Sequence, residues 1–407
     1  MSSSEAAQFG IENIPYGIAS SNTRSSPQAV TRIGDEVIFL ADLADKGAFG
    51  SDSASLSATF RENTLNTFAG LSKRIHTTVR SAIQLTYKNK KHVAASEHIK
   101  DVKLHIPVHI GDFTDFSASK DHLLNAGEAM MGIRALPPSF LNYPIVYAGR
   151  SSSIRVSGSP VARPLGQYWD NPAAADKRII FGPCRTLDYE LEVGAVIGRP
   201  VKAGAVLKAR DADEHIFGLV LVNDWSARDI QGLEMYPLGP FNGKNFGTTI
   251  SPWIVTLEAL SKHKVPAPPR DVPVADFMDD PEGANYDLNL SVDVVRNGTS
   301  HRTCSVGFNT MYWTFRHMLA HHTIGGCDLR TGDILASGTV SGEGETEHGC
   351  LLELVMGGKK PWKLNDGGEL RYLEDGDEVR FTGIVGGADS GIGFGGCSGV
   401  IHPAPKI

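Results

Sequence analysis

An acidic side chain follows the most apolar segment of the chain, where it could take part in catalysis or bind a cation. Asp224 comes directly after the apolar run Ile216 to Val222 and Asn223. Such a run predicts a buried strand, so Asp224 should lie at the mouth of a sheet. Arg228, Gln231 and Lys244 follow within the next 20 positions. The segment therefore predicts a polar pocket, and a solvated surface loop is the alternative.

A second pair of carboxylates lies in the segment Leu187 to Val193. Its apolar residues alternate with Glu190 and Glu192, so both acids should project from one face of a strand, about 7 Å apart. Two carboxylates at this distance repel each other unless a cation lies between them. The segment predicts a cation site, with a solvated strand face as the alternative.

Asp115, in the segment Ile110 to Phe116, is a further acidic candidate. A site built from four carboxylates, with no cysteine or histidine at ligand spacing, favours Mg²⁺ or Ca²⁺ over zinc. Arg228 and Lys244 would offset part of the negative charge.

One histidine is a candidate general base. Ser119 precedes the helix-like segment Lys120 to Ala126 and predicts an N-cap, which puts His122 in the first turn. The helix dipole there disfavours a cationic imidazole, so a neutral base is expected. Glu353, in the strand-like segment Cys350 to Leu354, is a candidate partner. The alternative is a surface histidine without a catalytic role.

Composition narrows the function class. The 407 residues are 41% hydrophobic and carry a net charge of -7, with acidic and basic residues mixed along the chain. We therefore expect no nucleic-acid and no membrane partner, but a small molecule. The start of the chain resembles no secretion signal and no window is apolar enough to span a bilayer. The five scattered cysteines suit reduced thiols in a cytoplasmic compartment.

The pattern predicts two domains, residues 1–107 and 108–407, separated near Pro107. The first mixes strands and helices. The second has many short strands, which predicts a mainly β, antiparallel, sandwich-like fold. Within it, apolar and polar residues alternate strictly from Tyr286 to Val294, which predicts a strand with one buried face. Asn297-Gly298 predicts a hairpin turn after this strand. Cys304 to His322 is read as the one long helix late in the chain.

Several motifs, in this order along the chain, resemble the fumarylacetoacetase family, and the resemblance runs nearly end to end. They are Gly111-Asp112-Phe113-Thr114-Asp115-Phe116, Asp188-Tyr189-Glu190-Leu191-Glu192, Asn223-Asp224-Trp225-Ser226-Ala227-Arg228-Asp229-Ile230-Gln231, Gly243-Lys244-Asn245-Phe246-Gly247-Thr248-Thr249 and Ala336-Ser337-Gly338-Thr339-Val340-Ser341-Gly342. The resemblance implies an N-terminal SH3-like barrel, a C-terminal β-sandwich roll and a homodimer. It also implies metal-dependent hydrolysis of a carbon–carbon bond in a 1,3-dicarbonyl acid such as fumarylacetoacetate.

Roles for individual residues follow from the same resemblance. It implies a metal site comprising Asp115, Glu190, Glu192, Asp224, Lys244 and Thr248. His122 resembles the base and Glu353 the residue that orients it. Arg228, Gln231, Lys244, Thr339 and Tyr147 match positions that touch the substrate or stabilise developing charge.

Three substrate-binding positions depart from the family pattern. The family carries a tyrosine, an arginine and a second tyrosine that hold the far carboxylate of the substrate, where this chain has Ser117, Met131 and Met235. Methionine cannot replace a bidentate arginine–carboxylate pair. The change favours a less acidic, more apolar acyl chain, with Arg134 and Tyr236 as nearby substitutes for the lost contacts.

Two alternatives stand beside carbon–carbon hydrolysis. One is decarboxylation, dehydration or isomerisation, in which the same metal site would stabilise an enolate of the substrate. The other is a catalytically silent binding protein, which the presence of all the expected ligands, base, partner acid and Lys244 argues against.

Overall fold

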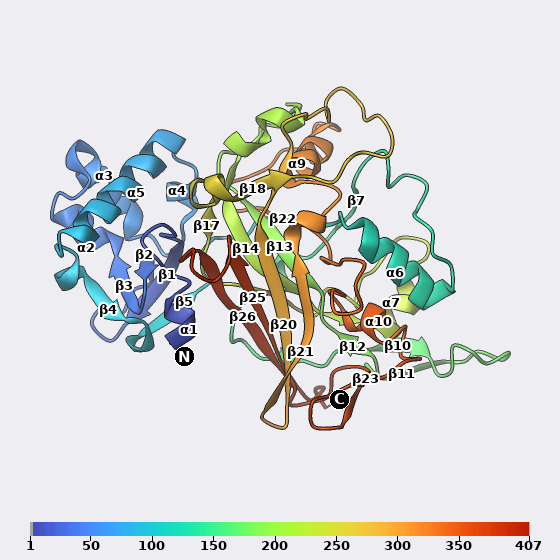
Figure 1. The fold of residues 1–407 in the computed structure, drawn as a ribbon. Coiled ribbons are helices and arrows are strands. Elements are labelled where there is room, and N and C mark those ends of the chain that lie inside the picture. Colours follow the sequence, from blue (N-terminus) through green and yellow to red (C-terminus); the bar gives the residue numbers. More distant parts are fainter. Residues whose placement is uncertain (1–2, 407) are drawn as a thin grey trace.

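The computed structural model describes residues 3–406 and shows a smaller N-terminal unit beside a larger β-rich body (Figure 1). The N-terminal unit is built on an antiparallel sheet of order β4-β3-β2-β1-β5. Its strands are β1 Tyr16–Ser21, β2 Gln28–Ile33, β3 Glu36–Phe39, β4 Ser96–His98 and β5 Val102–His105. Its helices are α1 Ser3–Ala6, α2 Leu40–Asp45, α3 Ser53–Phe60, α4 Asn66–Ala69 and α5 Lys73–Lys88. This small sheet agrees with the expected SH3-like barrel.

The larger body centres on an eight-stranded sheet of order β7-β6-β22-β13-β14-β16-β8, with β17 also paired to β14. The β6–β22 and β16–β8 pairs are parallel, and the other pairs are antiparallel. The strands are β6 Phe113–Ser117, β7 Ile145–Ala148, β8 Ile154–Val156, β13 Leu191–Ile197, β14 Ile216–Asp224, β16 Thr248–Ile250, β17 Val255–Thr256 and β22 Ile334–Ala336.

A second sheet, of order β21-β20-β25-β26-β9, packs against the first and completes a sandwich. Its strands are β9 Val161–Ala162, β20 Leu288–Arg296, β21 Thr299–Gly307, β25 Glu378–Val385 and β26 Gly393–His402. The alternating residues of β20 place Leu290 and Val292 in the core between the sheets. Asn297 and Gly298 both have positive φ, at 51° and 77°, which confirms the predicted hairpin turn.

The eight-stranded sheet is buried on both faces. On β14, Leu219 and Leu221 point into the core shared with the second sheet. Their neighbours Val220 and Val222 point into a different core, shared with the N-terminal unit. Because both faces are covered, β14 reads in the sequence as one continuous apolar run rather than as an alternation.

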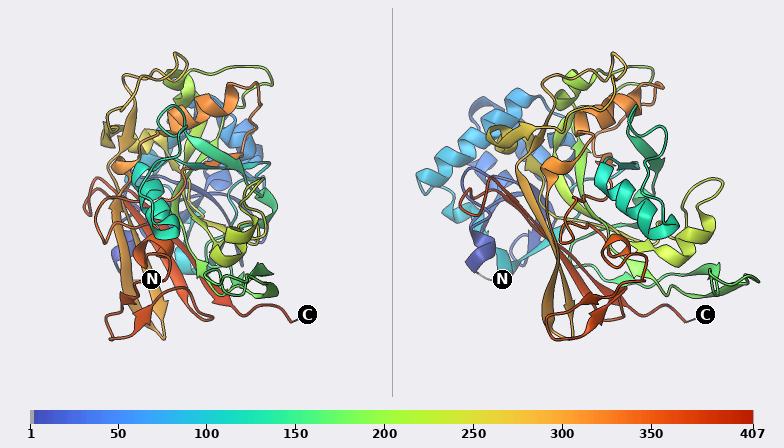
Figure 2. Two further views of the ribbon diagram at one scale, coloured as in Figure 1. Left: turned by 90° about the vertical axis from the view of Figure 1, so that its right-hand side faces the viewer. Right: turned by 45° about the vertical axis from the view of Figure 1, so that its right-hand side comes forward.

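The remaining short elements surround the sandwich. They are α6 Lys120–Met131, β10 Leu165–Trp169, β11 Ile179–Pro183, β12 Leu187–Asp188, β15 Ser226–Ala227, α7 Arg228–Glu234, α8 Leu257–Leu260, β18 Lys264–Pro266, β19 Ala284–Tyr286, α9 Phe315–Thr323, α10 Leu351–Leu354, β23 Trp362–Lys363 and β24 Glu369–Leu370. The β10–β11 hairpin extends away from the body (Figure 2). Among residues 3–406, no helix is long and apolar enough to cross a membrane.

Three local predictions were wrong. The segment Leu187 to Ile197 is two strands, with Glu190 in an isolated bridge to Cys350 at the break. The predicted helix Cys304 to His322 is the end of β21 followed by α9, because Cys304 continues the ladder with Val292. Glu353 lies on the short helix α10, not on a strand. In each case a contact with a distant segment overrides the local pattern.

Candidate active site

Four carboxylates meet at one end of the eight-stranded sheet. Asp115 lies on β6, Glu192 on β13 and Asp224 at the end of β14, and Glu190 lies in the break before β13. Each of the four offers an oxygen atom, and these atoms all lie within 4.8 Å of one another. All four side chains are buried. The structure thus brings together residues that span more than 100 positions of sequence.

Two cations partly neutralise this acidic cluster. Lys244 Nζ donates to Glu190 and, at 2.7 Å, to Asp224 Oδ2. Arg228 Nη1 donates to Glu190 Oε1 at 2.8 Å. Burial alone would raise the pKa of Glu190, but the charges of Lys244 and Arg228 outweigh it and lower the pKa to about 2. Glu190 is therefore ionised.

The other side of the cluster has no such cation. Burial, followed by the charge of Asp224, raises the pKa of Asp115, and burial with the charge of Asp115 raises that of Glu192. Asp115 Oδ1 and both carboxylate oxygens of Glu192 are buried without a hydrogen-bond donor among the described residues. Buried, unsatisfied carboxylate oxygens are costly, and a bound cation would satisfy them. The residues therefore fit a hard divalent ion, which prefers oxygen ligands.

Lys244 and Thr248 donate hydrogen bonds to the carboxylates from outside the cluster. An ammonium group has no lone pair for a metal, and Lys244 donates to two of the acids instead. Thr248 Oγ1 lies 3.4 Å from Asp224 Oδ1 and donates to it. The hydroxyl of Tyr147 donates to the other oxygen of Asp224 at 2.9 Å. These three side chains orient Asp224 and Glu190 from outside the ring of acids.

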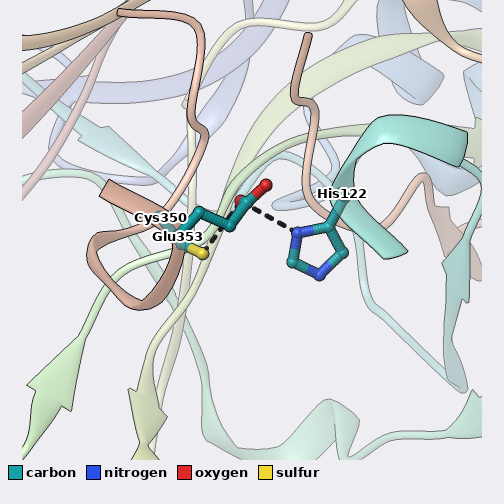
Figure 3. A group of neighbouring side chains, drawn as sticks. All are labelled: His122, Cys350 and Glu353. Atoms are coloured by element: carbon teal, nitrogen blue, oxygen red, sulfur yellow. Dashed lines mark hydrogen bonds and ion pairs between the residues drawn. The ribbon is translucent and has the colours of Figure 1, made fainter. Parts of the chain in front are cut away.

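The candidate base is held as its sequence context predicts. Ser119 Oγ accepts a hydrogen bond from the backbone N–H of His122 at 3.1 Å, which confirms the N-cap of α6. His122 Nδ1 lies 2.9 Å from Glu353 Oε2 (Figure 3). Burial would raise the pKa of Glu353, but His122 and further donors lower it. An ionised Glu353 can only accept, so Nδ1 donates to it, and in the neutral imidazole the lone pair is then on Nε2.

Glu353 accepts hydrogen bonds from three further side chains that sequence reasoning missed. Ser341 Oγ donates to Oε2 at 2.8 Å, Cys350 Sγ lies 3.1 Å from the same oxygen, and Asn125 Nδ2 donates to Oε1 at 3.1 Å. Figure 3 shows Cys350 and His122 converging on the carboxylate. Ser341 lies in one of the motifs that resemble the family, and this motif was the only sequence signal that could have identified it as a site residue. Asn125 and Cys350 had none, since only the tertiary fold brings them to Glu353.

A glycine allows the strands beside the acids to approach closely. Gly338 has a φ of 73°, and a Cβ there would lie 2.0 Å from the carbonyl oxygen of Phe116. Only glycine therefore permits this passage of the chain from β22 over the end of β6. The next residue, Thr339, lines the site, and its buried hydroxyl has no hydrogen-bond partner among the described residues.

Three of the four acids and the base line one cavity of about 500 Å³. Its polar wall includes Asp115, Ser117, His122, Tyr147, Glu190, Glu192, Arg228, Gln231, Lys244 and Thr339. Its apolar wall includes Met130, Ile145, Val146, Met235, Pro237, Leu238, Pro240 and Leu352. Every predicted site residue except Met131, Glu353, Asp224 and Thr248 is part of this lining.

The structure corrects the expected role of Met131. Its side chain is 68% exposed and does not line the cavity, whereas its neighbour Met130 does. The two side chains diverge because successive residues of α6 point about 100° apart. Arg134 donates to Asn125 and Glu128, and Tyr236 is 90% exposed, so neither reaches the cavity as a substitute clamp. Among the described lining residues, the only Lys and Arg side chains are Arg228 and Lys244, and both are paired with acids.

Gln231 lies on α7 one turn from Arg228. Its Oε1 accepts from Arg228 Nη1 at 3.2 Å, and its Nε2 lies 3.8 Å from Met235 Sδ. The amide N–H₂ therefore faces the cavity rim with a weak sulfur acceptor as its partner. A substrate oxygen would be a better acceptor for this donor.

Family models cover both parts of the chain. Residues 12–107 match the family described as Fumarylacetoacetase N-terminal, and residues 112–398 match Fumarylacetoacetate (FAA) hydrolase C-terminal. Together with the sandwich fold and the acidic site, these matches define the class of protein. The chain belongs to the fumarylacetoacetase family, which confirms the resemblance seen in the motifs.

Individual relatives match over nearly their whole length. The chain is 40% identical to the fumarylacetoacetase of Arabidopsis thaliana over 412 residues, 98% of this chain and 97% of the relative. It is 41% identical to that of Dictyostelium discoideum over 419 residues, 99% of this chain and 97% of the relative. As a member of this family the protein is a hydrolase that acts on carbon–carbon bonds.

A solved structure supports the fold. The fumarylacetoacetate hydrolase of the psychrophile Exiguobacterium antarcticum superposes with a TM-score of 0.54 at 16% sequence identity. The match covers 96% of this chain and 99% of that one. The mainly β architecture predicted from the sequence is thereby confirmed.

Proposed function

We propose that this protein hydrolyses the carbon–carbon bond between the two carbonyls of a 1,3-diketone acid, with fumarylacetoacetate or a less acidic analogue as substrate. The observation that carries the proposal is that His122 lines the same cavity of about 500 Å³ as Asp115, Glu190 and Glu192, which are three of the four carboxylates of the cluster. A cavity of this size accommodates a small-molecule substrate. The base and the cation site can therefore act on one molecule.

Asp115, Glu190, Glu192 and Asp224 would hold a divalent ion, Mg²⁺ or Ca²⁺. When bound, this ion supplies Lewis-acid polarisation of the substrate carbonyls. Lys244 and Arg228 offset part of the negative charge of the four acids, and a divalent cation would offset more of it. Carboxylate oxygens suit either ion, so the choice between them rests on measurement.

The chain's own residues supply the proton transfers. His122 Nε2 takes a proton from water as the water oxygen bonds to the acyl carbon, and Glu353 stabilises the resulting imidazolium through Nδ1–H. The carbon–carbon bond then breaks, and its electron pair leaves as an enolate. Burial alone would lower the pKa of Lys244, but the carboxylates of Asp224 and Glu190 have the larger effect and raise it above its usual value. The ammonium group therefore stays protonated. Lys244 and the amide of Gln231 stabilise the negative charge on the enolate. The imidazolium of His122 returns its proton to the enolate, so the products are the ketone and the new carboxylic acid.

The acyl end of the substrate meets the apolar wall. Met130, Met235 and Leu238 line this part of the cavity, and Ser117 contributes a single hydroxyl. An arginine–carboxylate pair in this place would be charge-assisted, and a methionine offers no equivalent. We infer a preference for an acyl chain that is less acidic than the fumaryl group.

Three further properties remain proposals. We propose a homodimer on the family resemblance, which sedimentation of the purified protein would test. We propose a reducing, cytoplasmic compartment, supported by five cysteines that are all free. We also retain the division into residues 1–107 and 108–407, although Val220 and Val222 of the larger part share a core with the N-terminal unit. Expression of residues 108–407 alone would show whether that part folds independently.

The experiment for the reaction is incubation of the protein and Mg²⁺, then Ca²⁺, with fumarylacetoacetate and a panel of neutral 1,3-diketones, with products identified by mass. Hydrolysis gives two fragments whose masses add up to that of the substrate plus one water. Decarboxylation loses carbon dioxide, dehydration loses one water, and isomerisation leaves the mass unchanged. Absence of the acid and ketone fragments from every diketone, with decarboxylated, dehydrated or isomerised product instead, would overturn the hydrolase assignment for this substrate class.

A further inference from the structure

A buried carboxylate outside the acidic cluster connects both halves of the site. Asp188, on β12, has no solvent exposure. Its Oδ2 accepts from Arg228 Nε at 2.8 Å, and Arg228 Nη2 lies at the same distance without being aligned as a donor. This fork holds the guanidinium so that its third nitrogen, Nη1, reaches Glu190. Asp188 thereby sets the position of a cation that lies against a candidate metal ligand.

The same carboxylate caps the helix that carries Glu353. Asp188 Oδ1 accepts from the backbone N–H of Leu351 at 2.7 Å, and Oδ2 accepts from that of Leu352 at 2.9 Å. These are the first residues of α10, whose N-cap residue, Cys350, makes no capping hydrogen bond with its side chain. The first N–H groups of a helix have no partner within it, so a short helix depends on such external acceptors. Glu353 is the next residue along.

We propose that Asp188 is a positioning residue of the active site that acts through Arg228 and Glu353. Through Arg228 it orients Glu190 in the acidic cluster. Through the first turn of α10 it fixes the carboxylate that orients His122. Asp188 therefore keeps the cation site and the base in register. It does so indirectly, through the Arg228 side chain and the backbone of α10. The proposal rests on the proposed roles of His122 and Glu353.

Asparagine is the informative substitution, since it keeps the shape of Asp188 but turns one acceptor into a donor. Asp188→Asn would leave an α10 amide facing the N–H₂ group in either orientation of the side chain, and Arg228 as well when the N–H₂ group replaces Oδ2. A matched control exists in Asp377, which is also buried, pairs with Arg296 at 2.6 Å and accepts from the backbone N–H of Glu374 at 2.7 Å. Asp377 is not part of the cavity lining.

Both variants would be compared with the full-length protein, loaded with Mg²⁺ and assayed below their unfolding temperatures. We expect Asp188→Asn to lower kcat by about 10- to 100-fold and to weaken Mg²⁺ binding, measured by calorimetry, by about the same factor. Asp377→Asn should lower the unfolding temperature but change kcat and Mg²⁺ affinity by less than about twofold. Equal losses of kcat in the two variants, or an unchanged kcat in Asp188→Asn, would overturn the proposal.

A double-mutant cycle separates positioning from general destabilisation. If Asp188 acts partly through Glu353, the loss of kcat in Asp188→Asn should shrink in a Glu353→Gln background. Losses that simply multiply would contradict that route. Asp188→Asn leaves Arg228 buried without its charged partner, which could prevent folding. In that case we would compare Arg228→Met with the double variant Arg228→Met/Asp188→Asn. We expect kcat of the double variant to be about 10-fold lower. No further fall in that background would overturn the proposal.

The failure of this proposal is distinguishable from failure of the proposed function. Wild-type turnover in Glu353→Gln and His122→Ala would refute the base assignment itself. The Mg²⁺ affinity of Asp188→Asn would still report on the Arg228 route, because that measurement needs no turnover.

Discussion

His122 Nδ1 and Glu353 Oε2 lie 2.9 Å apart, although 231 positions of sequence separate the two residues. Asp188 accepts from the backbone N–H of Leu352, the residue before Glu353, and Ser341 Oγ donates to the Glu353 carboxylate. Both side chains are buried, and His122 lines the cavity together with Asp115, Glu190 and Glu192. Because Nδ1 donates to Glu353, Nε2 is the nitrogen of the neutral imidazole that can accept a proton.

His122→Ala should remove the general base and lower kcat by about 10² to 10⁴. The metal site should survive, because the four carboxylates make no hydrogen bond to His122 among the described contacts. Glu353→Gln should lower kcat less, since the imidazole remains but loses its charged partner. Turnover kinetics and Mg²⁺ titration of both variants check this. Wild-type kcat in His122→Ala with Mg²⁺ bound would show that the base lies elsewhere.

The pH dependence of stability should change in Glu353→Gln. His122 and the other donors hold the pKa of Glu353 below its usual value in the folded protein. Its ionisation therefore stabilises the fold above the unfolded-state pKa of about 4.3, and that contribution is lost as pH falls through the lower folded pKa. The free energy of unfolding of the wild type should fall more steeply below about pH 5 than that of Glu353→Gln. Urea unfolding across this range measures it, and parallel curves would contradict the expectation.

Chelation should abolish turnover, and Mg²⁺ or Ca²⁺ should restore it. A bound ion also stabilises the fold, by about 2.7 kcal/mol when its free concentration is 100 times the Kd. Asp224→Ala and Glu192→Gln each remove one carboxylate from the cluster, so the ion should raise their unfolding temperature less. Glu369→Gln, which alters an exposed ion pair with Lys363, is the control. Full turnover after exhaustive chelation would exclude the metal-dependent reaction.

Met130→Arg should shift substrate preference toward the acidic diketone. A charged hydrogen bond to the far carboxylate contributes about 1.5 to 3 kcal/mol, or about a tenfold to hundredfold gain in kcat/KM for fumarylacetoacetate. Met131→Arg is the matched control, because Met131 points to solvent on the same helix turn. Kinetics with fumarylacetoacetate and a neutral analogue measure the ratio. The apolar-pocket inference fails if the unmodified protein prefers fumarylacetoacetate to every neutral analogue and Met130→Arg brings no gain.

Much of the fold could be predicted from local pattern. The strand β14 and the alternating strand β20 follow from the spacing of apolar residues, because burial on one face or on two leaves a direct trace in sequence. The N-cap at Ser119 is likewise a local signal. Residue type alone indicated a hard cation, since Asp115, Glu190, Glu192 and Asp224 offer only oxygen.

Only the tertiary structure decided how these residues act together. Glu353 belongs to a helix because Asp188, far from it in sequence, caps that helix. Met130 rather than Met131 faces the cavity because the packing of α6 sets its rotation, which a sequence of two adjacent methionines does not specify. Sequence determines which chemical groups are present and where strands begin. The contacts between segments far apart in the chain determine their distances, and those distances decide which carboxylates share a cation and which one orients the base.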